Sequence, residues 1–464
     1  MSQKHSIVIG ILGLLLPLLG LLIFSYSSNV ISTGDTNVYF YTAYQMLQGK
    51  QLYNDIVFTN LPLFPLISVI YFKLTGGNIY HFYFTEVVEV VILAILIFYA
   101  VYFQTRRYLA AIVSTLLFSF SVYNLIHLNY QTGVVTASLL SVVAYVFIKK
   151  KKPLLVGLSM SFCFLTKAYF IPILIALVYL SFTEFKLSQI KKMAIGLLLG
   201  LIPLIPYLIN SSSQMFYYLY DFSLKKAASF NKFRELRSFL SLDFGMVLLF
   251  LLSFPIKSYN RKFWLVLLLL FSLYFLVISD FPYIYFGMIM PFLSIRIGHL
   301  TSFLLEKSKN PSNEILLLIF ILPLLLFNIL QYRDFLAGNK IFNVDEVISL
   351  INQFQPERMY GVSSVTPALA YITDTPLFDN MIDVNPRFFE AGILDKKNIT
   401  KDVVTHKTIT VFLGFENKYQ SGNNLLDYVD KDVFIQNCEQ IKSFPIVWRP
   451  PINRIVLYGC SGQF

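Results

Sequence analysis

A series of long apolar stretches separated by short turns constrains this chain more than any other feature of its sequence. A helix that crosses the hydrocarbon core of a membrane needs about 20 mainly apolar residues. The sequence therefore predicts a polytopic α-helical membrane protein with about eleven spans. The expected spans lie at 1–26, 84–103, 108–125, 133–148, 154–165, 170–182, 193–209, 244–255, 263–278, 284–300 and 315–330.

The composition supports this class. Of the 464 residues, 56% are hydrophobic and 14% are charged, and the mean hydropathy is +0.64. A net charge of +11 would indicate nucleic acid as a partner in a soluble protein. Here most of the excess lies in short loops, where Lys and Arg hold a loop on the cytoplasmic side. We therefore expect membrane lipid as a partner, and no nucleic acid.

The basic loops predict the topology. Five clusters of Lys and Arg fall on one side of the membrane if the N-terminus is cytoplasmic. The clusters lie at 106–107, 149–152, 186–192, 257–262 and 307–309. The loop at 27–83 and the region after residue 331 then face the outside. The stretch 1–26 has no convincing cleavage site, so we expect it to be retained as an anchor in the cell membrane.

The C-terminal region, residues 332–464, differs in composition from the membrane domain, residues 1–331. A helical pattern at 344–353 and turn residues between short β-like runs predict a small mixed α/β domain outside the membrane. The runs lie at 359–363, 408–412 and 454–458. Cys438 and Cys460 can pair if this domain is extracytoplasmic, although their spacing alone does not establish a disulfide.

The first outer loop, residues 27–83, is where polar chemistry first appears. Asp35 follows a glycine and opens a helical pattern that ends near Gly49. In one interpretation its carboxylate caps that helix and accepts a hydrogen bond from the N–H of Asn37 or Val38. In the other it is a general base that takes a proton from an incoming hydroxyl. The sequence leaves both interpretations open.

A later outer loop carries a basic amphipathic pattern over residues 224–240. Phe and Leu recur at helical spacing among five basic residues, which are Lys225, Lys226, Lys232, Arg234 and Arg237. Such a pattern is typical of a helix attracted to lipid head groups. Because the charge rule disfavours basic residues in outer loops, the segment is also a candidate site for a phosphorylated lipid.

Three stretches resemble the GT-C superfamily, which consists of integral-membrane glycosyltransferases that use polyprenyl-phosphate sugars. The superfamily includes protein mannosyltransferases and the aminoarabinose transferases of lipid A. Residues 157–172 are similar to its short hairpin, and residues 360–376 are similar to the start of its outer domain. The first outer loop carries the pattern Gly34, Asp35, Tyr39, Ala43, Gly49, Tyr53, Asp55 and Pro62.

The resemblance implies roles for individual residues. Asp35 corresponds to the catalytic acid that acts as a base on the acceptor, and Lys167 to a lysine that meets the donor phosphate. Tyr39, Tyr53 and Asp55 match positions that contact substrate or hold the loop in shape. The basic residues of 224–240 are further candidates for binding the donor phosphate.

The loop at 127–133 departs from the family pattern. Many relatives carry a second acid before the fourth span, but this loop has no carboxylate. A hard divalent cation prefers acidic oxygens. We therefore assign no metal ligand, and the departure puts a metal-dependent mechanism in doubt.

The resemblance predicts a glycosyltransferase that moves a sugar from a polyprenyl-phosphate donor to a hydroxyl of a glycan, lipid or protein acceptor, with inversion. The lack of a Walker loop argues against a nucleotide-fuelled pump. Two alternatives remain, a transporter or flippase of lipid-linked sugars and a polymerase of surface glycans. A transporter more often has charged or broken helices at mid-bilayer. The main acids within the expected spans are Glu86 and Glu89, which share a helix face near the outer end of a span.

Overall fold

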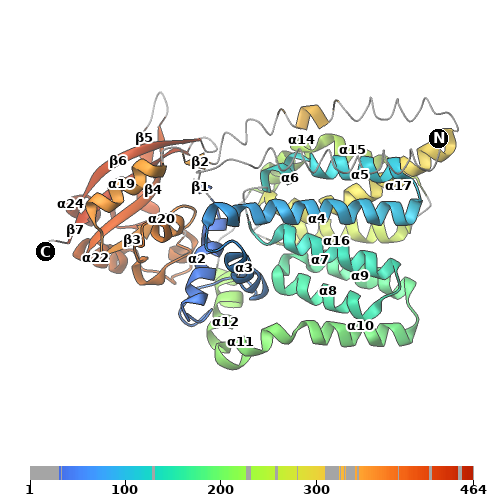
Figure 1. The fold of residues 1–464 in the computed structure, drawn as a ribbon, viewed down its shortest axis with the longest axis horizontal. Coiled ribbons are helices and arrows are strands. Elements are labelled where there is room, and N and C mark those ends of the chain that lie inside the picture. The colour runs from blue at the N-terminus through green and yellow to red at the C-terminus, as the bar shows by residue number, and fades with distance from the viewer. Residues whose placement is uncertain are drawn as a thin grey trace.

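The computed structural model contains a helical bundle and a C-terminal domain, with the first outer loop between them (Figure 1). The described residues are 31–32, 34–127, 131–225, 231–256, 260–278, 281–308, 323, 325–328, 330, 340–341, 344–384, 386–416, 421–447 and 452–462. The expected span at 1–26 lies outside the described residues, as does most of the one at 315–330.

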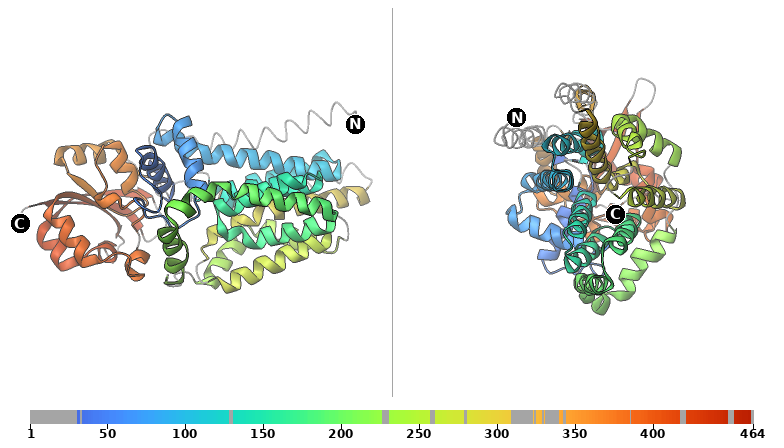
Figure 2. Two further views of the ribbon diagram at one scale, coloured as in Figure 1. Left: turned by 90° about the horizontal axis from the view of Figure 1, so that it is seen from below. Right: turned by 90° about the vertical axis from the view of Figure 1, so that its right-hand side faces the viewer.

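The longer helices of the bundle run side by side along one direction (Figures 1 and 2). They are α4 (Ile79–Thr105), α5 (Tyr108–Ser119), α7 (Val134–Lys149), α8 (Pro153–Thr166), α9 (Ile171–Glu184), α10 (Leu187–Gly200), α15 (Phe244–Leu252), α16 (Arg261–Val277) and α17 (Met290–Ser308). The shorter helices are α6 (Val122–His127), α11 (Ile205–Asn210), α12 (Ser212–Phe216), α13 (Phe222–Lys225) and α14 (Lys232–Leu242).

The outward faces of the bundle are apolar. Leu198, Ile209 and Val277 are 70%, 74% and 78% exposed, respectively. Among the described residues, two helical segments, Ile79–Thr105 and Leu187–Asn210, are long and apolar enough to cross a membrane by themselves, and five further apolar helices are shorter. Exposed apolar side chains at this density fit a lipid surface better than water.

Glycine allows two bundle helices to approach closely. A methyl group on Gly157 of α8 would lie 2.0 Å from the carbonyl oxygen of Met193, and one on Gly196 of α10 would lie 2.1 Å from that of Leu154. Small residues at helix crossings bring backbones together in membrane proteins. The α8–α10 contact therefore depends on these two positions.

Most expected spans within the described residues correspond to helices, with three breaks. The expected span at 284–300 begins as a 3-10 helix over Tyr283–Met288 and continues in α17. The expected span at 108–125 is divided into α5 and α6. The carboxylate of Asp243 accepts hydrogen bonds of 3.0 Å from the N–H groups of Val122 and Tyr123, and so caps α6 from a distant part of the chain. The expected span at 193–209 is interrupted near Pro203, which has no N–H for the helix.

The first outer loop contributes a strand and two helices. β1 (Ile31–Ser32) leads into α2 (Thr36–Leu47), and α3 (Leu63–Leu74) packs against α2, α4 and α8. At 12 residues, α3 is too short to span a membrane. This agrees with the interruption of its apolar stretch by Pro62 and Pro65.

The C-terminal domain is the expected mixed α/β unit. Its helices are α19 (Val344–Phe354), α20 (Thr366–Ile372), α21 (Pro386–Glu390), α22 (Lys396–Thr405), α23 (Leu425–Tyr428) and α24 (Lys431–Asn437). Its strands are β2 (Lys340–Ile341), β3 (Arg358–Gly361), β4 (Lys407–Glu416), β5 (Ser421–Asn423), β6 (Cys438–Val447) and β7 (Ile452–Ser461). The expected β-like runs at 408–412 and 454–458 fall within β4 and β7. The run at 359–363 overlaps β3, which ends at Gly361, and the expected helix at 344–353 is α19.

One sheet ties this domain to the first outer loop. Its order is β1-β2-β6-β7-β4-β3, and β5 pairs with β4. The β3–β4 pair is parallel and the other pairs are antiparallel. β1 comes from the loop before α2 and pairs with β2, so the sheet contains residues from both ends of the chain.

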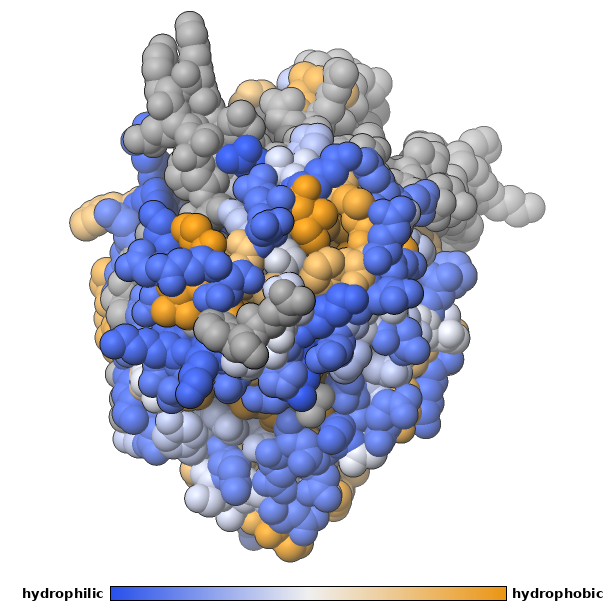
Figure 3. Space-filling model, turned by 90° about the vertical axis from the view of Figure 1, so that its left-hand side faces the viewer, coloured by the Kyte–Doolittle hydropathy of each residue, from blue (hydrophilic) through white to orange (hydrophobic). Residues whose placement is uncertain are grey.

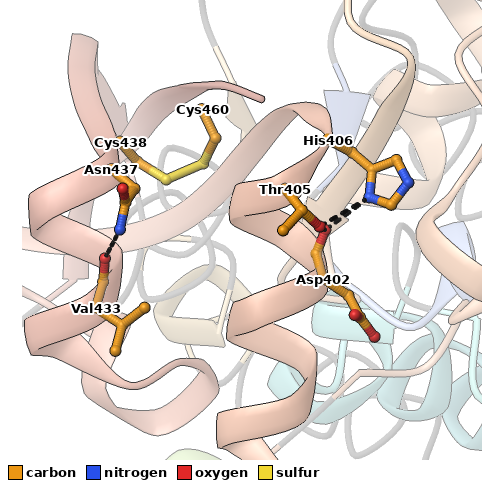
Figure 4. Close-up of a disulfide and its surroundings, with 7 residues drawn as sticks. All are labelled: Asp402, Thr405, His406, Val433, Asn437, Cys438 and Cys460. Carbon is orange, nitrogen blue, oxygen red and sulfur yellow. Dashed lines mark hydrogen bonds between the residues drawn. A yellow bond between two sulfur atoms is a disulfide. The ribbon is translucent and has the colours of Figure 1, made fainter. Parts of the chain in front are cut away.

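A disulfide joins two neighbouring strands of the sheet. Cys438 and Cys460 lie opposite each other on β6 and β7 and are bonded (Figure 4). Both residues are buried. The face of the domain that points away from the bundle is mainly hydrophilic (Figure 3), as expected for a domain outside the bilayer.

Candidate functional site

Asp35 lies where the first outer loop meets the C-terminal domain. It is exposed and occupies the N-cap position of α2, but its side chain makes no capping hydrogen bond. The expected bond from the N–H of Asn37 or Val38 is therefore wrong. The backbone is held instead by the N–H of Gly34, which donates to the carbonyl oxygen of Ser364 at 3.0 Å.

Asn37 fixes the start of α2. Its amide Nδ2 donates to the carbonyl oxygens of Ser32 and Ser364, at 2.7 and 2.6 Å. Its Oδ1 accepts a hydrogen bond of 2.7 Å from the hydroxyl of Tyr83 in α4. Asn37 is fully buried, so these bonds are costly to lose. The loop that carries Asp35 is thereby tied to the bundle and to the C-terminal domain.

Tyr39 stands one turn after Asp35 and is 4% exposed. Its ring packs edge-on against Phe64 of α3, with the centroids 4.6 Å apart. Burial raises the pKa of Tyr39 well above its usual value, and the negative charges of Asp35, Asp383 and Glu86 raise it further. The hydroxyl therefore remains protonated. Around it lie acids from the outer loop, the C-terminal domain and α4.

The carboxyl groups of Glu86 and Glu89 differ in their hydrogen bonds. Glu89 accepts hydrogen bonds from the hydroxyl of Thr136, at 2.8 Å, and from that of Tyr71. Glu86 is 1% exposed, and neither of its carboxyl oxygens has a hydrogen-bond partner among the described residues. A buried polar group without a partner is rare in native structures and calls for an explanation. An ionisable residue inside a membrane segment is a candidate functional group.

The loop that lacks the second acid reaches the same region. The backbone N–H of Gln131 donates to the hydroxyl of Thr36 at 2.7 Å, and its side-chain amide donates to the hydroxyl of Thr85. Thr85 precedes Glu86 on α4. Gln131 therefore links the start of α2 to α4 at the residue before Glu86.

Lys167 is buried where α8 ends. It is 4% exposed, and its Nζ donates to Oδ1 of Asn60 at 3.2 Å. The same Nζ lies 5.6 Å from the ring centroid of Tyr285. A cation held in a buried site near an aromatic ring can bind an anion. Asn60, which positions this cation, has no signal in the sequence.

Tyr53 and Asp55 hold the loop between α2 and α3. Burial raises the pKa of Tyr53, and its hydroxyl donates to the carbonyl oxygen of Asn60 at 2.7 Å. Tyr53 and Lys167 therefore meet at the same residue. The exposed Asp55 accepts a hydrogen bond of 2.8 Å from the N–H of Gln51, which closes a turn. These contacts give both residues a role in shaping the loop.

The basic segment is only partly the expected helix. α14 begins at Lys232, and Lys226 lies outside the described residues. Phe239 stacks on Phe286 at 4.3 Å, whereas Phe233 is 86% exposed. Some apolar side chains of this segment therefore pack on the bundle, and others are exposed on the outer surface.

The basic side chains of this segment contact other parts of the chain. Lys225 lies over the ring of Tyr217, Lys232 donates to the carbonyl oxygen of Leu276, and Arg234 pairs with Glu235 at 3.1 Å. Arg237 is exposed. In the part of the chain that the structure describes, none of the four forms a hydrogen bond or ion pair with Asp35 or Lys167. Binding of a phosphate by these residues stays a prediction.

Comparison with known proteins places this arrangement in a known fold. No protein-family model and no curated protein sequence matches the chain. Among solved structures, ArnT from Cupriavidus metallidurans bound to undecaprenyl phosphate matches with a TM-score of 0.64 and 12% sequence identity, covering 98% of each chain. The fold is that of ArnT. The apo state of ArnT matches with a TM-score of 0.66, also at 12% identity, over 100% of this chain and 99% of ArnT.

The likeness to ArnT extends over both parts of the chain. It confirms the expected fold, a helical bundle with a small C-terminal sheet. At this level of identity the match concerns the fold. Chemical roles must come from the residues themselves.

Proposed function

We propose that this chain is a membrane glycosyltransferase that moves a sugar from a polyprenyl-phosphate donor to an acceptor hydroxyl. The observation that carries the proposal is the likeness to ArnT bound to undecaprenyl phosphate over nearly the whole chain. The position of Asp35, exposed at the junction of three structural parts, supports it. The cell membrane is the proposed location, with the C-terminal domain on the extracytoplasmic side.

The donor phosphate binds near Lys167 in this proposal. The lysine is buried at the end of α8 and is bonded to Asn60 just before α3. A buried cation attracts an anion more strongly than a solvated one, because water does not screen it. The basic residues of 225–237 attract the phosphorylated lipid at the surface of the bilayer.

The transfer is a single displacement. Asp35 takes the proton of the acceptor hydroxyl while the hydroxyl oxygen forms a bond to the anomeric carbon. The bond between that carbon and the phosphate oxygen breaks, and polyprenyl phosphate leaves with the electron pair. Lys167 offsets the charge that grows on the phosphate. Attack from the side opposite the leaving group inverts the anomeric centre.

Glu86 supplies an acceptor of hydrogen bonds to the donor sugar. Its carboxyl group is buried and without a partner among the described residues. The preceding residue, Thr85, is hydrogen-bonded to Gln131, whose backbone N–H donates to Thr36 next to Asp35. Sugar hydroxyls are donors that can satisfy such a group. This role accounts for the cost of burying it.

A transfer assay separates the enzyme from a flippase of the same lipids. Membranes containing the protein are supplied with labelled polyprenyl-phosphate sugars, and both the labelled product and the released polyprenyl phosphate are measured. The proposal expects the two to appear in equal amounts. Movement of the intact lipid across the membrane without release of polyprenyl phosphate would show a flippase instead.

A further inference from the structure

A cavity of about 610 Å³ opens between α2, the turn before α4 and the C-terminal domain. Ligand pockets in proteins usually measure roughly 300–1,000 Å³. The cavity borders α2 on the side of Tyr41, Tyr44 and Gln45, and α20 on the side of Tyr371. It is therefore distinct from the Lys167 site, which lies at the end of α8.

Aromatic rings form its walls. Four tyrosines line it, which are Tyr41, Tyr44, Tyr80 and Tyr371. The rings of Tyr44 and Tyr371 meet at 79° with their centroids 5.1 Å apart, so they form a corner. Both side chains are partly exposed. Ring faces carry negative charge and pack against the weakly positive C–H groups of a pyranose.

Polar groups at the rim are of the kind that bind hydroxyls. Asp374 is exposed. The Oδ1 of Asn78 accepts hydrogen bonds from the N–H groups of Tyr80 and His81, which leaves its Nδ2 to donate to a ligand. Carboxylate and amide groups offer sugars both acceptors and donors.

The charge of the lining disfavours an anionic ligand. Among the described residues that line the cavity there is one acid, Asp374, and no Lys, Arg or His. A phosphate group would find no cation here and would be repelled by Asp374. This lining therefore favours a neutral ligand over the donor phosphate.

We infer that this cavity binds a neutral carbohydrate, as the part of the acceptor glycan that lies away from the reacting hydroxyl. The inference rests on the proposed function, because it assigns the acceptor of that transferase to the class of neutral glycans. Tyr44 stands nine residues after Asp35, about 14 Å along the helix axis. The acceptor is therefore longer than a single sugar ring. Binding of its remote part holds the hydroxyl near Asp35.

Binding is measured directly on the full-length protein in nanodiscs. The probes are neutral gluco-, galacto- and manno-oligosaccharides of three to six units, with inorganic phosphate and an uncharged peptide as comparisons, read by saturation-transfer NMR. We expect at least one neutral oligosaccharide to bind. Tyr44→Ala should weaken it about tenfold or more, whereas Tyr44→Phe, which keeps the ring, should stay within about twofold. Binding of the peptide alone, or of no saccharide, would overturn the inference.

A second variant tests the cavity independently, in case Tyr44→Ala misfolds. Asp374 has a positive φ of 50°, which Asn also tolerates, so Asp374→Asn should leave the backbone in place. It should weaken saccharide binding about threefold or more. If neither variant weakens binding while both melt like the native protein, the cavity is not the site.

The outcomes separate this inference from the proposed function. Saccharide binding should persist in Asp35→Asn, which carries out no transfer in our proposal. If saccharide binds in this way but the native protein transfers no sugar, the carbohydrate site is supported and the proposed transferase function is wrong. If the native protein transfers sugar but the KM for acceptor is unchanged in Tyr44→Ala and Asp374→Asn, the transferase function is supported and the inferred carbohydrate site is wrong.

Discussion

At the scale of single residues, Glu86 is the clearest example of a side chain that lowers stability and is retained for function. A buried carboxyl group without a partner costs about 1–3 kcal/mol. Glu86 is in this position in α4, whereas Glu89, one turn further, is bonded to Thr136 and Tyr71. Residues that break a local rule are expected at functional sites.

Replacing Glu86 by Leu should therefore make the protein more stable and less active. We expect the melting temperature in detergent to rise by a few degrees, because the unpaired group is removed. Sugar transfer should fall about tenfold or more. Glu86→Gln keeps the shape and a hydrogen-bond acceptor and should retain more activity. A stable Glu86→Leu variant with full activity would contradict the role we assign.

Lys167 makes the second prediction at this scale. Lys167→Met keeps the length of the side chain and removes its charge, so the KM for donor should rise about tenfold or more, as expected when one charged partner of a phosphate is lost. Lys167→Arg, the matched control, should stay closer to the native value. Equal KM values for the native protein and Lys167→Met, from donor titrations, would exclude Lys167 from the phosphate site.

Asp35, Lys167, Glu86 and Glu89 are noteworthy in the sequence because an acid or a base in an apolar chain stands out. Tyr39 and Tyr53 are singled out by the resemblance to the GT-C pattern. Neither signal identifies Asn60 or Asp383. Polar residues are common in loops, and only the fold shows which of them meet: Asn60 meets Lys167, and Asp383 lies near Tyr39.

At the scale of elements, the disulfide holds β6 and β7 in the middle of the sheet. Closing a loop of this size, with a sequence separation of 22 between the cysteines, stabilises a folded domain by about 3 kcal/mol. Both strands pair along most of their length, and β7 continues the pairing to β4. The sheet should therefore survive the loss of the bond, but with less stability.

The double variant Cys438→Ser, Cys460→Ser should accelerate proteolysis of the C-terminal domain, and purified protein should melt at a lower temperature. The control is Cys163→Ser: Cys163 lies buried in the bundle, where its thiol donates to the carbonyl oxygen of Ala137 at 3.2 Å and a hydroxyl can do the same. Unchanged proteolysis in the double variant would show that the disulfide does not stabilise the domain.

Elements are largely predictable for this chain, because apolar length and turn residues are strong local signals. The helix after Asp35, the strands β3, β4 and β7, and α19 all follow from local patterns. The division between α5 and α6 does not, because its cap is Asp243, which is far away in the sequence. β1 and β2 are only two residues long each and pair across the whole chain, which no local pattern reveals.

At the scale of the whole molecule, the first outer loop and the C-terminal domain share one core. Phe40 of α2 is fully buried and packs edge-on against Tyr371 of α20, with the ring centroids 4.7 Å apart, and also against Phe72 and Phe82. The segment that carries Asp35 is thus supported from both sides.

Phe40→Ala should destabilise the first outer loop and the C-terminal domain together. Truncating a buried Phe costs about 3–5 kcal/mol. Hydrogen exchange should therefore become faster in α2 and in α20, and sugar transfer should fall. Phe233→Ala is the matched control. Because Phe233 is 86% exposed, this variant should change neither hydrogen exchange nor sugar transfer. Faster exchange confined to α2 would show that the two parts fold independently.

The most direct test of the proposed mechanism compares sugar transfer by the native protein with Asp35→Asn, using Asp55→Asn as a matched exposed acid from the same loop. Asn cannot take a proton, so we expect Asp35→Asn to lose transfer by about a thousandfold or more while Asp55→Asn keeps most of it. The variants must insert in the membrane and melt like the native protein. If Asp35→Asn transfers sugar at the native rate, Asp35 is not the base and the mechanism is wrong.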